Sequence, residues 1–141
     1  MKNKTVCVIG LGYIGLPTAA LLANKGFSVF GVDINEEVVS TINEGKIHIV
    51  EAGLGTFVKS AVSTGQLKAF NKIQLSDIYM ICVPTPFHTN SGIPKPNIEY
   101  VLSAAKSIAS FIKSGDIIIL ESTSPVGTTE KIKQILIDCG T

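Results

Sequence analysis

The chain has 141 residues, a formal net charge of +1 and 45% hydrophobic residues. This length suffices for one domain with a buried core, and the balanced charge without basic clusters argues against a nucleic-acid partner. No apolar run approaches the roughly 20 residues that cross a membrane, and residues 1–4 lead into a predicted strand instead of a signal peptide. We therefore expect a cytoplasmic protein with neither a nucleic-acid nor a membrane partner.

The three cysteines are odd in number and widely spaced. Cys7 and Cys82 lie in or at the end of apolar segments, and Cys139 lies near the end of a predicted helix. Isolated cysteines of this kind are typical of small buried hydrophobic residues, not of a disulfide framework or a metal site. The sequence therefore predicts buried free thiols and no bound metal.

A strand over residues 4–9 is followed by glycines in the pattern Gly-x-Gly-x-x-Gly and by a helix over 13–25. A strand, a glycine turn and a helix in this order offer backbone N–H groups to the pyrophosphate of a dinucleotide. Gly10 permits the tight turn, Gly12 lets the backbone approach the phosphates, and Gly15 lets the helix lie close to its strand. The spacing also occurs in ordinary strand-to-helix turns, so the prediction depends on the flanking pattern.

A second strand over 28–33 ends at Asp33. Asp33 lies about 20 residues beyond the last glycine, which is where such folds place the acid that binds the adenosine ribose. Either Asp33 or Asn35 could instead cap the next helix. A carboxylate here favours a free 2′-hydroxyl and repels a 2′-phosphate. All twelve basic residues are lysine, so the guanidinium clamp that often holds the extra phosphate of NADP is lacking. The sequence predicts NAD, although a lysine could still bind a phosphate as a point charge.

Strands and helices continue to alternate along the rest of the chain. We expect strands over 67–70, 78–83 and 116–120, and helices over 36–44, 54–63, 98–113 and 128–138. The strand over 78–83 is apolar enough to be covered on both faces, and the one over 116–120 is another buried strand. Asn97 caps the helix that follows a proline-rich loop over 84–96. This alternation predicts an α/β fold of the Rossmann type, a doubly wound parallel sheet in three α/β/α layers.

Ligands of such folds sit beyond the carboxyl ends of the strands, where the strand order reverses. The glycine turn and the segments 83–86 and 121–129 should converge there, the turn holding the pyrophosphate. Hydroxyl side chains are concentrated from Ser122 to Thr129. They could bind a sugar or carboxamide, or equally cap the last helix and satisfy the loop backbone.

Four segments together resemble the amino-terminal domain of the UDP-sugar 6-dehydrogenases, in the UDP-glucose/GDP-mannose dehydrogenase family. They cover residues 10–17, 31–35, 83–86 and 121–129, and the resemblance runs from Thr5 to the end of the chain. Residues 47–51 and 121–130 are most similar to members that oxidise UDP-N-acetyl-D-mannosamine. Members acting on UDP-N-acetylglucosamine or UDP-glucose usually differ in these two stretches.

The resemblance implies that residues 1–141 form an NAD-binding domain truncated from a longer enzyme. A central dimerisation helix and a UDP-sugar-binding domain would follow, and the full-length protein would be a homodimer. The implied reaction is a four-electron oxidation of the sugar C6 alcohol to a carboxylate with two NAD, for surface polysaccharide synthesis. The nucleophilic cysteine and the catalytic lysine and asparagine of the family lie beyond residue 141, so this chain is expected to be inactive alone.

The resemblance also assigns roles to single residues. Tyr13 and Ile14 contact the pyrophosphate through the backbone, and Asp33 holds the adenosine ribose. Thr123 borders the nicotinamide and the water used in hydrolysis, while Glu121 has either a loop-orienting or a purely structural role. The whole implied cofactor-binding set is Gly10, Gly12, Tyr13, Ile14, Gly15, Asp33, Thr85, Thr123 and Thr129.

A protein of another class remains an alternative: a dinucleotide-sensing module without chemistry of its own. The hydroxyl-rich segment 121–129 argues against it, because a sensor needs no groups around the nicotinamide. His48 and His88 stand alone in connecting segments, which is a poor setting for a catalytic histidine.

Overall fold

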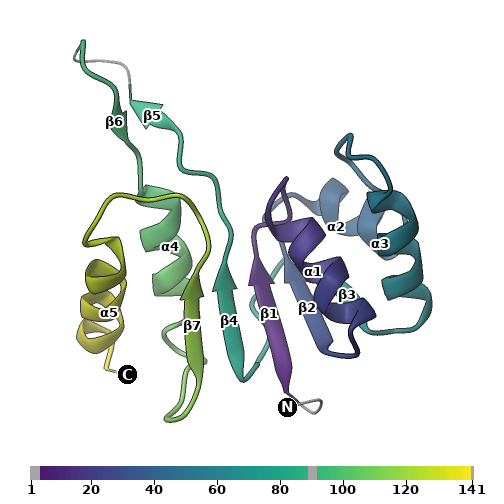
Figure 1. Cartoon of the computed structure of the whole chain (residues 1–141). Coiled ribbons are helices and arrows are strands. Elements are labelled where there is room, and N and C mark those ends of the chain that lie inside the picture. The colour runs from purple at the N-terminus through teal and green to yellow at the C-terminus, as the bar shows by residue number, and fades with distance from the viewer. Residues whose placement is uncertain (1–3, 89–91, 141) are drawn as a thin grey trace.

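The computed structural model describes residues 4–88 and 92–140. They contain a five-stranded parallel sheet in the order β3-β2-β1-β4-β7, with helices on both faces (Figure 1). The predicted fold class is confirmed. The strands are β1 (Thr5–Ile9), β2 (Ser28–Val32), β3 (Leu67–Phe70), β4 (Ile78–Ile81), β5 (Phe87–His88), β6 (Lys95–Pro96) and β7 (Ile117–Leu120). The helices are α1 (Gly15–Asn24), α2 (Glu36–Asn43), α3 (Leu54–Ser63), α4 (Glu99–Ile108) and α5 (Thr128–Asp138).

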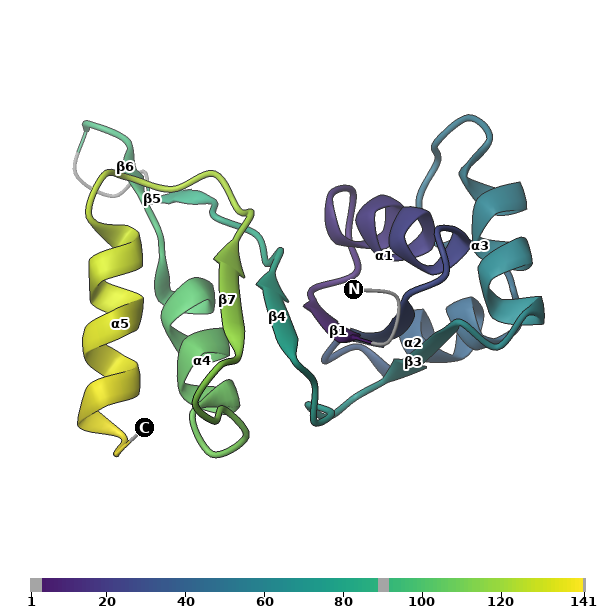
Figure 2. The same cartoon turned by 60° about the horizontal axis from the view of Figure 1, so that its bottom comes forward.

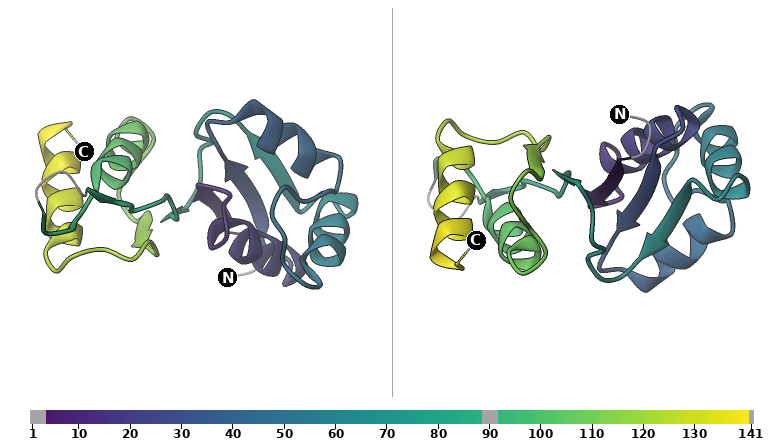
Figure 3. Two further views of the ribbon diagram at one scale, coloured as in Figure 1. Left: turned by 90° about the horizontal axis from the view of Figure 1, so that it is seen from above. Right: turned by 90° about the horizontal axis from the view of Figure 1, so that it is seen from below.

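The two faces of the sheet carry separate hydrophobic clusters. Because side chains alternate along a strand, Val6 and Val8 of β1 point into a cluster with α1, α2 and α3, and Cys7 and Ile9 point into one with α4 and α5. Figures 2 and 3 show these helices as two groups at opposite ends of the sheet. The strand order reverses between β1 and β4, so the carboxyl ends of these strands define the expected ligand edge.

The prediction of a fully buried strand over 116–120 is wrong. Ile118 and Leu120 pack against the cluster of α4 and α5, but Ile117 and Ile119 on the other face are 48% and 39% exposed. β7 is an edge strand of the sheet, and helix α1 packs over β1, β2 and β3, so it does not cover this face of β7. An apolar strand is buried on both faces only where helices cover both faces of the sheet at that strand.

Two further boundaries differ from the sequence prediction. Helix α4 ends at Ile108, not at residue 113, and the chain then turns, with the Phe111 N–H donating to the Ile108 carbonyl at 2.9 Å. The loop over 84–96 contains an antiparallel pair, β5 with β6, that projects beyond the sheet (Figure 1). Helix α4 begins one residue later than predicted, so Ile98 holds the N-cap position, but the Asn97 side-chain oxygen still accepts from the Glu99 N–H at 2.8 Å.

All three cysteines are free thiols, as predicted. Cys7 and Cys82 are buried, but the expectation that Cys139 is buried is wrong. Cys139 directly follows the last residue of α5, and its side chain is exposed. His88 is also exposed.

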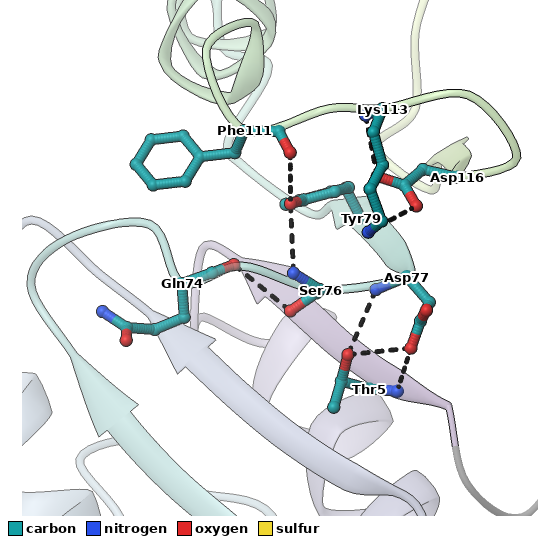
Figure 4. A network of polar contacts seen from close by, with 8 residues as sticks. All are labelled: Thr5, Gln74, Ser76, Asp77, Tyr79, Phe111, Lys113 and Asp116. Carbon is teal, nitrogen blue, oxygen red and sulfur yellow. Dashed lines mark hydrogen bonds and ion pairs between the residues drawn. The ribbon is translucent and has the colours of Figure 1, made fainter.

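A polar network joins the amino-terminal ends of β1 and β4, at the edge opposite the expected ligand edge (Figure 4). The Asp77 carboxylate accepts hydrogen bonds from the Thr5 N–H at 2.8 Å and the Thr5 hydroxyl at 3.0 Å. Nearby, the Tyr79 hydroxyl accepts from the Ser76 N–H at 3.1 Å. The bonds from Thr5 stabilise the ionised carboxylate and hold the pKa of Asp77 below its usual value.

Acid should therefore weaken the fold partly through Asp77. A lowered pKa contributes stability above the unfolded-state value near pH 4, and this contribution is lost as the pH falls through the folded-state pKa. We expect the Tm, followed by circular dichroism, to decline from about pH 5 to about pH 2, and to decline less in Asp77→Asn. Glu51→Gln, at an exposed position, is the control that keeps the full decline. An Asp77→Asn profile parallel to that of the unmodified chain contradicts this account.

Candidate cofactor-binding site

The glycine turn between β1 and α1 packs backbone against backbone. Gly10 has a φ of +91°, and a Cβ there would lie 2.8 Å from the carbonyl oxygen of Cys82 in the neighbouring segment. A Cβ on Gly15 would overlap the carbonyl oxygen of Gly10. A Cβ on Gly12, in contrast, would meet no atom within 4 Å. Two glycines are therefore needed for packing, and the third borders open space that a ligand can occupy.

The amino terminus of α1 is suited to an anion. No side chain caps this helix, and its first turn has no acidic residue. Among the described residues, the N–H groups of Tyr13 and Ile14 have no hydrogen-bond partner, and both side chains are more than half exposed. Unpaired N–H donors and the positive end of the helix dipole favour a phosphate group at this place.

Asp33 lies at the carboxyl end of β2, beside the turn. Its carboxylate accepts hydrogen bonds from the Leu11 N–H at 3.0 Å and the Asn35 N–H at 2.9 Å. Asn35, not Asp33, caps α2, because the Asn35 side chain accepts from the Glu37 N–H at 2.9 Å. Asp33 is therefore not the cap of α2, and its contact with the adenosine ribose stays a prediction.

Thr85 and Thr123 come together on the far side of the turn, beyond β4 and β7. They line a groove of about 400 Å³ with Ser124 and with Phe87, Pro96 and Pro125. The hydroxyl groups of segment 121–129 fall into two groups. Ser122 donates to the Val83 carbonyl at 2.7 Å and Thr128 donates to the Pro125 carbonyl at 2.7 Å, so both satisfy backbone. Thr123 and Ser124 are left to face the groove.

Thr129 does not join this group. It lines a separate groove of about 460 Å³ between α5 and the face of β7 that carries Ile118 and Leu120, together with Ile132. A role of Thr129 in cofactor binding stays a prediction from the resemblance.

Glu121 makes contacts that the sequence did not reveal. One carboxylate oxygen accepts a hydrogen bond from the Thr18 hydroxyl at 3.1 Å, and the other accepts from the Cys82 thiol at 3.2 Å. These partners are 103 and 39 positions away in the sequence, and no local pattern marks such distant pairs.

The buried thiols are poor nucleophiles. Burial and the neighbouring Glu121 carboxylate raise the pKa of Cys82, and burial raises the pKa of Cys7 to about 11. Both therefore stay protonated at neutral pH, whereas a cysteine nucleophile reacts as the thiolate. Within residues 4–88 and 92–140, no group of three potential metal ligands comes together, and no helix is long and apolar enough to cross a membrane.

The parallel sheet, the glycine turn under an uncapped helix and the acid at the end of β2 define a dinucleotide-binding α/β domain. The family model described as "UDP-glucose/GDP-mannose dehydrogenase family, NAD binding domain" matches residues 4–140. The chain belongs to this family, as the resemblance implied, and the predicted cofactor, NAD, is confirmed as the cofactor of the domain.

Individual relatives agree with this assignment. The chain is 53% identical over 134 residues to a UDP-N-acetyl-D-mannosamine dehydrogenase of Campylobacter jejuni, covering 95% of this chain and 32% of the relative. It is 50% identical over 133 residues to an NDP-N-acetyl-D-galactosaminuronic acid dehydrogenase of Ralstonia nicotianae, covering 94% and 31%. The solved structure of a UDP-N-acetyl-mannosamine dehydrogenase from Staphylococcus aureus superposes with a TM-score of 0.90 at 37% identity, covering 97% and 33%. The chain spans about a third of the length of these relatives.

Alanine at two of the glycines should separate folding from binding. Gly15→Ala forces a Cβ into the Gly10 carbonyl, so we expect the free energy of unfolding to fall by about 3 kcal/mol or more. Gly12→Ala fits the free backbone, so its Tm should stay unchanged while the Kd for NAD rises by about tenfold, or ~1.4 kcal/mol. Denaturant titration and calorimetric titration with NAD measure the two effects. A Gly12→Ala variant that is less stable than Gly15→Ala contradicts this assignment of roles.

Proposed function

We propose that this domain is the NAD-binding part of a longer UDP-sugar 6-dehydrogenase. One observation carries the proposal: a carboxylate after β2, an uncapped helix end after β1 and a groove lined by hydroxyl groups beyond β4 and β7 follow one another along one edge of the sheet. That order of groups matches the adenosine ribose hydroxyls, the diphosphate and the polar carboxamide end of NAD. A dinucleotide sensor would need only the first two.

The proposed roles follow from the chemistry of each group. The Tyr13 and Ile14 N–H groups donate to the diphosphate, and Asp33 accepts from the adenosine ribose hydroxyls. Thr85 and Thr123 hold the nicotinamide end, and the Thr123 hydroxyl orients the water used in hydrolysis. When bound, NAD supplies a hydride acceptor for the C6 carbon of the sugar. Neither buried thiol is proposed as the nucleophile, because each remains protonated.

We further propose UDP-N-acetyl-D-mannosamine as the substrate, oxidised to the uronate with two NAD for surface polysaccharide synthesis. The activity for which the Campylobacter jejuni relative is named supports this choice. The Ralstonia nicotianae relative, named for an N-acetylgalactosaminuronic acid, is nearly as similar, so this domain alone discriminates poorly between epimers. UDP-N-acetylglucosamine and UDP-glucose remain alternative substrates. A homodimer of the longer protein and a cytoplasmic location complete the proposal.

Asp33 should decide the choice between NAD and NADP. Its carboxylate repels a 2′-phosphate, so calorimetric titration should give the unmodified chain a Kd for NADP at least about tenfold above that for NAD. Asp33→Asn loses the charge and retains one of the two oxygens that accept from the neighbouring N–H groups. We expect this variant to bind NAD more weakly and to reduce the ratio of the two Kd values. An unmodified chain that binds both cofactors equally rules out the proposed role of Asp33.

Turnover should require more than these 141 residues. We expect the chain to bind NAD but to produce no NADH, measured by absorbance, when UDP-N-acetyl-D-mannosamine is added. A protein carrying this domain followed by the remaining two thirds of its relatives should form two NADH per sugar, because a four-electron oxidation delivers two hydrides. Rapid NADH formation by the 141-residue chain would overturn the proposal that catalysis needs residues outside this domain.

A further inference from the structure

We propose that Glu121 is a positioning residue that keeps the two halves of the NAD site at one fixed spacing. The inference rests on the proposed function and adds a residue to which that function gives no direct contact with NAD. Glu121 follows β7 directly and reaches α1 through Thr18 and the end of β4 through Cys82. One carboxylate thus connects three elements at the point where the strand order reverses.

The connection leads back to the glycine turn through Cys82. The Cys82 N–H donates to the Ile9 carbonyl at 2.8 Å, and its own carbonyl lies against Gly10. The Cβ of Cys82 lies 3.1 Å from the place where a Cβ of Gly15 would stand. Glu121, Thr18, the turn and Cys82 therefore form a closed ring of contacts around the amino terminus of α1.

In the part of the chain that the structure describes, α1 and β7 share little packing. Ile117 and Ile119 face the same side of the sheet as Glu121, and both are exposed. The hydrogen bond from Thr18 therefore provides a polar link between α1 and the segment that carries Thr123. A hydrogen bond to an ionised carboxylate is stronger than a neutral one, which suits Glu121 for holding two elements that share little buried surface.

The halves that Glu121 connects bind different parts of NAD. The turn and Asp33 hold the adenosine diphosphate half, and Thr85 and Thr123 hold the nicotinamide half. A ligand that spans both halves gains from a fixed spacing because the site needs no rearrangement on binding. ADP occupies only the first half, so its affinity should be indifferent to that spacing. The comparison of NAD with ADP is therefore a readout that a general loss of stability does not imitate.

The test uses the 141-residue chain and calorimetric titration with NAD and with ADP. Thr18→Val removes the hydroxyl at nearly constant volume, and we expect the Kd for NAD to rise about fivefold but that for ADP less than about twofold. Thr18→Ser retains the hydroxyl and should restore the affinity for NAD. Glu121→Ala should reproduce Thr18→Val, and the double variant should be little worse than Glu121→Ala, because both changes break the same link.

Thr56→Val, at an exposed threonine on α3 whose side chain has no hydrogen-bond partner in the described part of the chain, is the matched control and should change neither Kd. Equal weakening of NAD and ADP by Thr18→Val overturns the positioning role while leaving the proposed function intact. Failure of Thr18→Ser to restore NAD binding overturns the positioning role in the same way. An unmodified chain that binds neither ligand overturns both proposals.

Discussion

The close contact between the glycine turn and the end of β4 is the constraint on which this domain depends. Gly10 and Gly15 lie against each other and against Cys82 with no room for a single Cβ. This contact brings the amino terminus of α1 down onto the sheet, so that unpaired N–H groups are presented at its carboxyl edge. Backbone N–H groups at a helix terminus can bind a phosphate without a basic side chain, which is the mode of binding proposed here.

The polar residues around the turn differ in what their side chains contact. Asp33 does not cap α2, because Asn35 does so, and the Asp33 carboxylate accepts hydrogen bonds from the Leu11 and Asn35 N–H groups beside the turn. Thr123 lines the groove, while Ser122 and Thr128 satisfy the loop backbone. The roles of Asp33 and Thr123 in binding NAD are those that we propose.

Much of this could be predicted from local sequence patterns. The turn, the strand before it and Asp33 lie within one βαβ unit, where periodicity and glycine spacing determine the geometry. The exposure of Ile117 could not be predicted, because an apolar strand has the same pattern whether one face or both are covered. The contacts of Glu121 with Thr18 and Cys82 were missed for a related reason: they depend on the order of strands in the sheet.

The most direct test of the central claim is a titration of the isotope-labelled chain with NAD, followed by amide chemical shifts. The account predicts the largest shifts at the N–H groups of Tyr13 and Ile14, with further shifts at Asp33 and Thr123. Those positions come from separate segments and meet only at the carboxyl edge of the sheet. Shifts confined to the groove between α5 and β7, with the turn unchanged at saturation, would contradict it.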